Sequence, residues 1–231
     1  MREVIIACDF SSKQQTLAFL DQFTEKKPFV KIGMELFYAE GPSIVTEIKN
    51  RGHKIFLDLK LHDIPNTVYK AMLNIGKLKV DMTNVHAAGT IAMMAKAKQA
   101  LLETNPATLL IAVTQLTSTE ETIMHSELLI SETLNNTVIK YAQNAEKAGL
   151  DGVVCSPLEA NLIKQNCQPN FISVTPGIRF ASNTKDDQKR VTTPKQAKEI
   201  GASYIVVGRS ITQAADPVAA YNRCVLEFEG E

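Results

Sequence analysis

Short runs of hydrophobic, often β-branched residues alternate with longer amphipathic segments from one end of the chain to the other. The short runs predict strands at Val4–Asp9, Phe29–Gly33, Lys54–Lys60, Asp81–His86, Leu109–Gln115, Asp151–Cys155, Phe171–Thr175 and Tyr204–Val207. The amphipathic segments predict a helix after each strand, for example at Pro42–Arg51, Ile91–Glu103, Val138–Ala148, Leu158–Gln165, Pro194–Ile200 and from about Ile211 to Phe228.

Repetition of this strand-and-helix unit over 231 residues predicts an α/β fold, a (β/α)8 TIM barrel, as a single catalytic domain spanning residues 1–231. The competing layout is a doubly wound open sheet, which usually carries a glycine-rich fingerprint after its first strand. Here the first strand is followed by Asp9-Phe10-Ser11-Ser12, without glycine, so the barrel is favoured.

The composition of the chain limits the binding partners and the cellular compartment that we expect. Lys plus Arg and Asp plus Glu both number 25, so the formal net charge is zero. This balance gives no long-range attraction to nucleic acid or to an anionic membrane. The apolar run near the N-terminus is too short for the core of a signal peptide, and no apolar stretch is long enough to span a membrane. We therefore expect a cytoplasmic protein. The four cysteines have no metal or redox spacing and are interpreted as buried thiols.

Charged residues occur where a barrel strand should be apolar. Asp58 and Lys60 lie two apart and therefore share one face of the third strand, while Lys31 lies in the second. With Asp63 they form a candidate cluster of alternating sign, in which each charge is paired. Asp63 lies past the strand end, so it either enters this cavity or caps the helix that Pro65 begins. The alternative for Asp58 and Lys60 is an internal salt bridge that only supports packing.

The cluster limits the chemistry. A lysine held between carboxylates stays protonated, which makes it a poor Schiff-base nucleophile and a good proton donor to a carbanion. Asp58 beside it would face an anionic group of the substrate. A reaction that loses a negative group and gains a proton in its place, such as decarboxylation, fits this pair.

The ends of the last two strands predict a phosphate site. Thr175-Pro176-Gly177-Ile178-Arg179 and Val207-Gly208-Arg209-Ser210 occupy the positions where such barrels often bind phosphate. Glycine lets backbone N–H groups approach an anion, and Arg179 and Arg209 offer paired donors. The alternative is that the glycines shape turns and the arginines are surface charges. The long polar segment from Arg179 to Thr193 is typical of a lid, from which Gln188 would reach a bound phosphate.

Taken together, these motifs resemble those of the orotidine 5'-monophosphate decarboxylases of the bacterial type, over essentially the whole chain. The resemblance rests on Asp58-Leu59-Lys60-Leu61-His62-Asp63-Ile64-Pro65-Asn66-Thr67, on Leu116-Thr117-Ser118 and on the two phosphate motifs. It implies decarboxylation of orotidine 5'-monophosphate to uridine 5'-monophosphate in pyrimidine biosynthesis, by a homodimer that uses neither metal nor organic cofactor.

The resemblance also implies individual roles. Lys60 would protonate carbon 6 of the pyrimidine, Asp58 would lie next to the departing carboxylate, and Lys31 would hold Asp58 and a ribose hydroxyl. Further roles fall to Asp9 on the ribose side, to Thr117 near the pyrimidine, to Asp63 and Thr67 from the second subunit, and to Arg179, Gln188, Gly208 and Arg209 at the phosphate.

Three alternative functions share some of these sequence features. A magnesium-dependent sugar-phosphate decarboxylase or synthase of the same barrel superfamily shares the Asp-x-Lys-x-x-Asp spacing but has a glutamate where this chain has Lys31, which would repel the metal. A catalytically silent, nucleotide-binding barrel would release no carbon dioxide. In a Schiff-base aldolase, borohydride would trap the substrate as a covalent adduct on Lys60. His86 is interpreted as part of the pocket wall.

Overall fold

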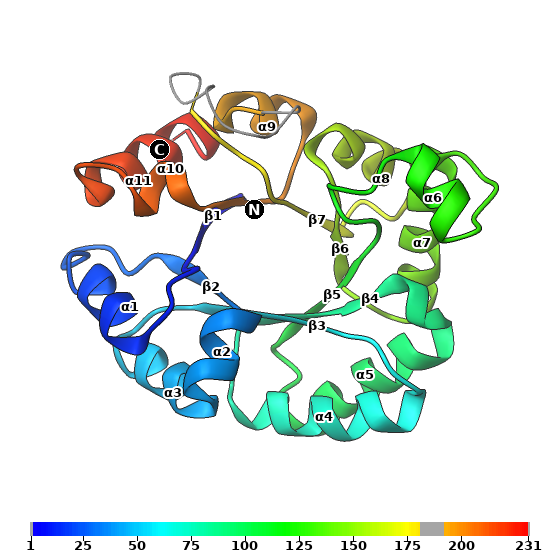
Figure 1. Ribbon diagram of the computed structural model, residues 1–231, viewed down its shortest axis with the longest axis horizontal. Coiled ribbons are helices and arrows are strands. Elements are labelled where there is room, and N and C mark those ends of the chain that lie inside the picture. Colours follow the sequence, from blue (N-terminus) through cyan, green and yellow to red (C-terminus); the bar gives the residue numbers. More distant parts are fainter. Residues whose placement is uncertain (1, 181–191, 231) are drawn as a thin grey trace.

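The barrel predicted from the strand pattern is present and closed. In the computed structural model, which describes residues 2–180 and 192–230, parallel strands follow one another around the barrel in chain order, and β1 pairs with β8. Figure 1 shows the ring of strands enclosed by the helices. The strands are β1 (Glu3–Ala7), β2 (Phe29–Gly33), β3 (Ile55–Leu61), β4 (Met82–His86), β5 (Leu109–Val113), β6 (Gly152–Val154), β7 (Ile172–Thr175) and β8 (Tyr204–Val207).

Helices connect successive strands on the outside of the barrel. They are α1 (Lys13–Leu20), α2 (Met34–Glu40), α3 (Pro42–Asn50), α4 (Pro65–Lys77), α5 (Thr90–Thr104), α6 (Glu121–Glu127), α7 (Leu134–Lys147), α8 (Ala160–Asn166), α9 (Pro194–Ile200), α10 (Arg209–Thr212) and α11 (Pro217–Phe228). Short 3₁₀ turns at Ala87–Gly89 and Pro157–Glu159 precede α5 and α8.

The single long helix predicted from about Ile211 to Phe228 is wrong. The structure divides this segment into α10 and α11. Pro217 lacks the N–H that a helix interior needs, so it begins a new helix instead. The side chain of Asp216 accepts a hydrogen bond from the Ala219 N–H and caps that new helix.

Two apolar regions stabilise the barrel. The larger lies between strands and helices and includes Leu57 and Leu59, which point away from the barrel axis as the strand period predicts. The smaller fills the barrel interior and includes Ile5, Phe29 and Phe56. Of the cysteines, Cys8, Cys155 and Cys224 are buried, which confirms the interpretation of these three as interior thiols; Cys167 is half-buried.

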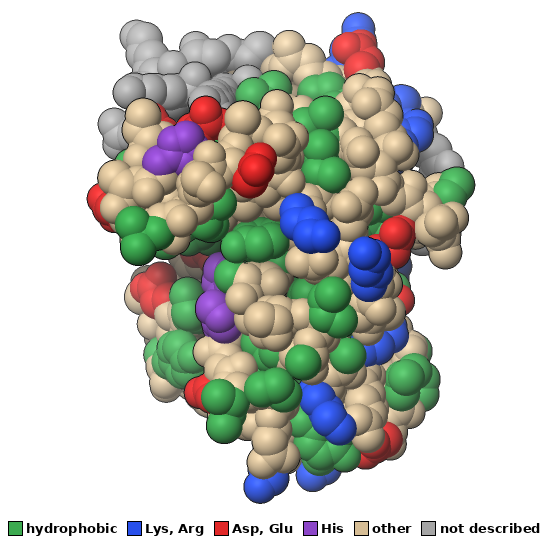
Figure 2. All heavy atoms as spheres, turned by 90° about the vertical axis from the view of Figure 1, so that its right-hand side faces the viewer, with side chains coloured by type: hydrophobic (Ala, Val, Ile, Leu, Met, Phe, Trp, Pro, Cys, Tyr) green, Lys and Arg blue, Asp and Glu red, His purple; other side chains and the backbone are tan. Residues whose placement is uncertain are grey.

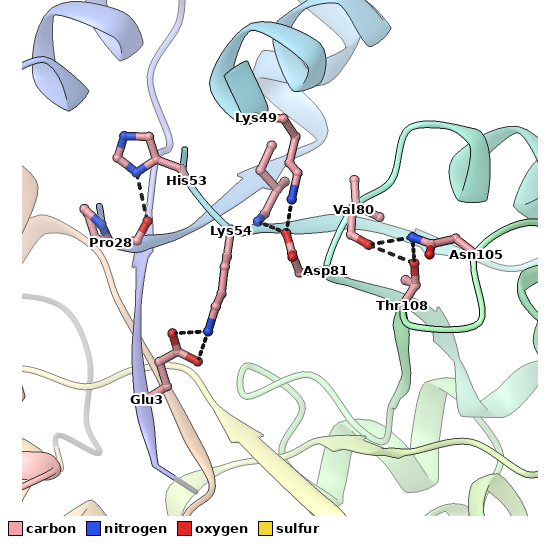
Figure 3. Close-up of polar contacts among 10 residues, drawn as sticks. Glu3, Pro28, Lys49, His53, Lys54, Val80, Asp81, Asn105 and Thr108 are labelled. Carbon is pink, nitrogen blue, oxygen red and sulfur yellow. Dashed lines mark hydrogen bonds and ion pairs between the residues drawn. The ribbon is translucent and has the colours of Figure 1, made fainter. Parts of the chain in front are cut away.

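Polar contacts join the strands near their amino-terminal ends (Figure 3). Lys54 pairs with Glu3 at 2.9 Å, and the Asp81 carboxylate accepts hydrogen bonds from Lys49 and from the Ile55 N–H. Thr108 donates a hydrogen bond to the Val80 carbonyl at 2.8 Å. In barrels of this type the amino-terminal end contributes stability and the opposite end carries the active site.

The outer surface mixes charges of both signs. Figure 2 views the side covered by α5, α6 and α7, where lysine and arginine side chains lie among acidic, hydrophobic and neutral ones. No helix in the described part of the chain combines the length and the apolar character needed to cross a lipid bilayer.

Candidate active site

Polar side chains lie directly above an apolar layer inside the barrel. Phe29 in β2 and Phe56 in β3 belong to the inner apolar layer, and Lys31 and Asp58 follow two residues later on the same faces. In both β2 and β3, the inward face therefore changes from apolar to charged toward the carboxyl end of the strand. This change places the charged groups at the end of the barrel where catalysis takes place in such folds.

Four charged side chains form one continuous chain of ion pairs. Lys31 Nζ lies 2.9 Å from Asp9 Oδ1 and 3.4 Å from Asp58 Oδ2. Lys60 Nζ lies 2.6 Å from Asp58 Oδ1. The order is therefore Asp9, Lys31, Asp58, Lys60, with alternating sign as the sequence predicts; within one chain, Asp9 belongs to this series and Asp63 does not. Each of the two inner charges has an opposite charge on both sides.

The pairing keeps the two inner groups ionised although both are largely buried. Burial alone would raise the pKa of Asp58, but the ammonium groups of Lys31 and Lys60 outweigh burial and lower this pKa below its usual value. Burial alone would lower the pKa of Lys31, but Asp58 and Asp9 raise it overall. At neutral pH the site therefore holds a fixed carboxylate between two amines.

The backbone departs from a regular strand at Lys60. This residue has a φ of 53°, in the left-handed region that residues with side chains rarely adopt. The register between β3 and β4 shifts between Leu57 and Leu61. Despite this irregularity Lys60 reaches Asp58, so the predicted proximity of the two side chains is confirmed. Unusual backbone of this kind concentrates at functional sites.

Asp63 lies outside the charged chain. It is exposed, and its Oδ1 accepts a hydrogen bond from the neighbouring Ile64 N–H at 2.6 Å. The suggestion that Asp63 caps α4 is wrong, because Ile64 occupies the N-cap and α4 begins without a side-chain cap. Thr67, in the first turn of α4, and Thr117, after β5, are likewise exposed on the catalytic side of the barrel.

The arginine-bearing loops border the same charged chain. A cavity of about 220 Å³ is lined by Asp9, Lys31, Gly177, Arg179, Gly208 and Arg209, together with neighbouring residues. Arg179 is buried, and its backbone N–H donates a hydrogen bond to the Thr192 carbonyl. The helix that follows Gly208 is only four residues long, so its dipole is weaker than the long predicted helix would supply. Gln188 lies outside the described residues.

Asn84, which was not among the predicted site residues, is buried beside Asp58. Its amide nitrogen donates to Asp58 Oδ1 at 2.7 Å, and its amide oxygen accepts from the Lys60 N–H at 2.8 Å. A signal was present, because Met82 and Asn84 in β4 repeat the apolar-then-polar spacing of Phe29 with Lys31.

His86, at the end of β4, has its ring 5.7 Å from that of His62. Burial, reinforced by His62 and Lys60, lowers the pKa of His86. His86 is half-buried and His62 is exposed, so neither ring is enclosed in the barrel interior.

The carboxylates of the site are paired with ammonium groups. Within residues 2–180 and 192–230, no three His, Cys, Asp or Glu side chains converge as metal ligands would. The Lys31 ammonium bridges the carboxylates of Asp9 and Asp58. What the arrangement offers instead is a cationic amine beside a fixed carboxylate, next to a cavity with two arginines.

The chain belongs to the family described as Orotidine 5'-phosphate decarboxylase / HUMPS family, whose model matches residues 2–224. Among its relatives, it is 56% identical to the protein named orotidine 5'-phosphate decarboxylase of Staphylococcus saprophyticus, covering 95% of each chain. It is 53% identical to that of Geobacillus sp. (strain WCH70), covering 98% of this chain and 97% of the relative. The crystal structure of orotidine 5'-phosphate decarboxylase from Lactobacillus acidophilus has a TM-score of 0.89, with 42% identity over 99% of both chains.

Proposed function

We propose that this protein decarboxylates orotidine 5'-monophosphate to uridine 5'-monophosphate, with Lys60 as the proton donor. The observation that carries the proposal is the ion-pair chain Asp9, Lys31, Asp58, Lys60 at the catalytic end of the barrel, next to the arginine-lined cavity. Family membership and the names of the relatives support the same reaction.

In this mechanism the phosphate of the nucleotide binds at Arg179, Gly208 and Arg209, with Gln188 as a further contact. Binding energy from this non-reacting group aligns the pyrimidine with the charged chain. Asp9 and Lys31 bind the ribose, and Thr117 contacts the pyrimidine.

The substrate carboxylate lies against Asp58, and the bond between it and carbon 6 breaks to release carbon dioxide. The bonding electron pair stays on carbon 6, and Lys60 Nζ transfers a proton to it. The amine is thus a fixed positive charge where negative charge develops.

A homodimer completes the proposal, with Asp63 and Thr67 contributed to the site of the partner subunit. Large exposed apolar side chains lie on the loops and helices that follow β2 to β5, where Asp63 and Thr67 also lie. They include Met34, Tyr38, Ile64, Ile91 and Leu116. Exposed apolar side chains of this size gain free energy when another protein surface covers them, and most oligomers of identical chains are symmetric dimers.

Complementation tests whether Asp63 acts across the interface. Asp63→Ala and Lys60→Ala homodimers are each expected to be nearly inactive. After unfolding and refolding together, half of the dimers are mixed and one of their two sites is intact, so activity should recover to about a quarter of the wild-type value. The control is each variant refolded alone. No recovery, with mixed dimers demonstrated by mass spectrometry, would place Asp63 in its own subunit's site.

Removal of metal ions separates this function from that of the magnesium-dependent alternative. Protein treated with excess chelator is expected to convert orotidine 5'-monophosphate at the untreated rate, because Lys31 neutralises the carboxylates that a cation would need. The measurement is the loss of substrate ultraviolet absorbance, with carbon dioxide release measured in parallel. Activity that disappears with chelator and returns with magnesium would favour the alternative function.

A further inference from the structure

Asn84 is the uncharged member of the candidate site, and both ends of its side chain are used. It lies in β4 with 1% of its surface exposed. One end donates to the Asp58 carboxylate at 2.7 Å, and the other accepts from the Lys60 backbone at 2.8 Å. A single amide therefore joins the two central residues of the proposed reaction. Asp58 lies against the departing carboxylate, and Lys60 donates the proton.

The contact with the Lys60 backbone falls where the β3–β4 pairing is irregular. The register shifts between Leu57 and Leu61, and Lys60 adopts a left-handed conformation. The Asn84 side chain provides the Lys60 N–H with a buried acceptor in this conformation. A disfavoured backbone conformation persists only where surrounding contacts fix it, and this hydrogen bond is such a contact.

The contact with Asp58 determines the position of one particular oxygen. Asp58 Oδ1 accepts from Asn84 Nδ2 and also pairs with Lys60 Nζ at 2.6 Å. Asp58 Oδ2 faces Lys31 instead. Asn84 therefore fixes the carboxylate orientation as well as the backbone from which Lys60 extends. Because the amide is neutral, it does this without adding a charge to the site.

We infer that Asn84 is a positioning residue, which holds the Lys60 amine and the Asp58 carboxylate in the geometry that proton transfer to the substrate requires. The inference rests on the proposed decarboxylation. It predicts an effect on the chemical step and little effect on nucleotide binding, because the arginine-lined cavity is bordered by loops after β1, β7 and β8, whereas Asn84 lies in β4.

Asn84→Ala is expected to lower kcat by about 10²-fold, which is the typical cost of misplacing a catalytic group by about 1 Å. KM and the affinity for uridine 5'-monophosphate, measured by calorimetry, should stay close to wild type. Thr83→Val is the matched control. Thr83 is the buried neighbour in β4, and its hydroxyl donates to the Leu57 carbonyl of β3 at 3.0 Å. The control should lower the melting temperature but leave kcat unchanged.

Asn84→Asp gives a signature that a purely structural role would not produce. The introduced carboxylate can still accept from the Lys60 N–H but repels Asp58, which raises the upper apparent pKa of the pair. Below that pKa the two carboxyls share one proton, which restores both the hydrogen bond and the native charge. Activity of the variant relative to wild type should therefore increase as the pH is lowered. Other ionisable groups near the pair, present in both proteins, are Asp9, Lys31, Lys60, His62 and His86.

The outcomes separate this inference from the function on which it rests. Wild-type protein without decarboxylase activity would overturn both. An active wild type together with a folded Asn84→Ala variant whose kcat stays near wild type would overturn only the role of Asn84. The same holds if Thr83→Val loses as much kcat as Asn84→Ala, or if the activity of Asn84→Asp relative to wild type does not depend on pH.

Discussion

Lys60→Ala is expected to abolish turnover, lowering kcat by at least about 10⁴-fold, while uridine 5'-monophosphate still binds. The substitution removes both the proton donor and the positive charge beside the developing carbanion. Each of these contributes strongly to the rate of the chemical step. Binding persists because the arginine-lined cavity is left intact. Single-turnover kinetics measure the first effect, and calorimetry with the product measures the second.

Lys54→Ala is the matched control for this variant. Lys54 immediately precedes β3, but its amine pairs with Glu3 near the amino-terminal end of the barrel. The control should retain kcat and lose at most a modest amount of stability, since partly exposed ion pairs contribute about 0–1 kcal/mol. Substantial turnover by Lys60→Ala would contradict the proton-donor role, and loss of product binding would indicate a wider structural effect.

Arg209→Ala is expected to raise KM strongly and to lower kcat/KM by about 10²-fold. Hydrogen bonds to a charged group contribute about 1.5–3 kcal/mol each, and a difference of about 1.4 kcal/mol is tenfold in a rate or an equilibrium constant. Arg209 lies directly after Gly208 and lines the cavity shared with Asp9, Lys31 and Arg179. Steady-state kinetics with orotidine 5'-monophosphate check the prediction.

Comparison of a nucleotide with its nucleoside assigns the Arg209 effect to the phosphate. The variant should bind uridine 5'-monophosphate more weakly than wild type, whereas uridine, which has no phosphate, should bind equally to both. Arg51→Ala provides a control, because Arg51 pairs with Asp21 and Glu47 and does not line this cavity. An unchanged KM for Arg209→Ala would remove Arg209 from the phosphate site.

Much of the fold was predictable because its signals are local. Each strand is a short apolar run, and alternating strands and helices leave few arrangements for parallel strands. The proximity of Asp58 and Lys60 was also predictable, since residues two apart in a strand share a face. The prediction failed at the last helix, where periodicity continued through Pro217 but the missing backbone N–H did not allow the helix to continue.

By itself, the sequence determined the strand-and-helix order, the barrel, and the type of charge at the ends of the second and third strands. Tertiary structure alone decided that Asp9 pairs with Lys31, and that Asn84 links Asp58 to a left-handed Lys60. These contacts depend on how the closed barrel brings β1, β2, β3 and β4 together in space. Local periodicity gives the direction in which a side chain points within its own strand, but not which distant side chain meets it there.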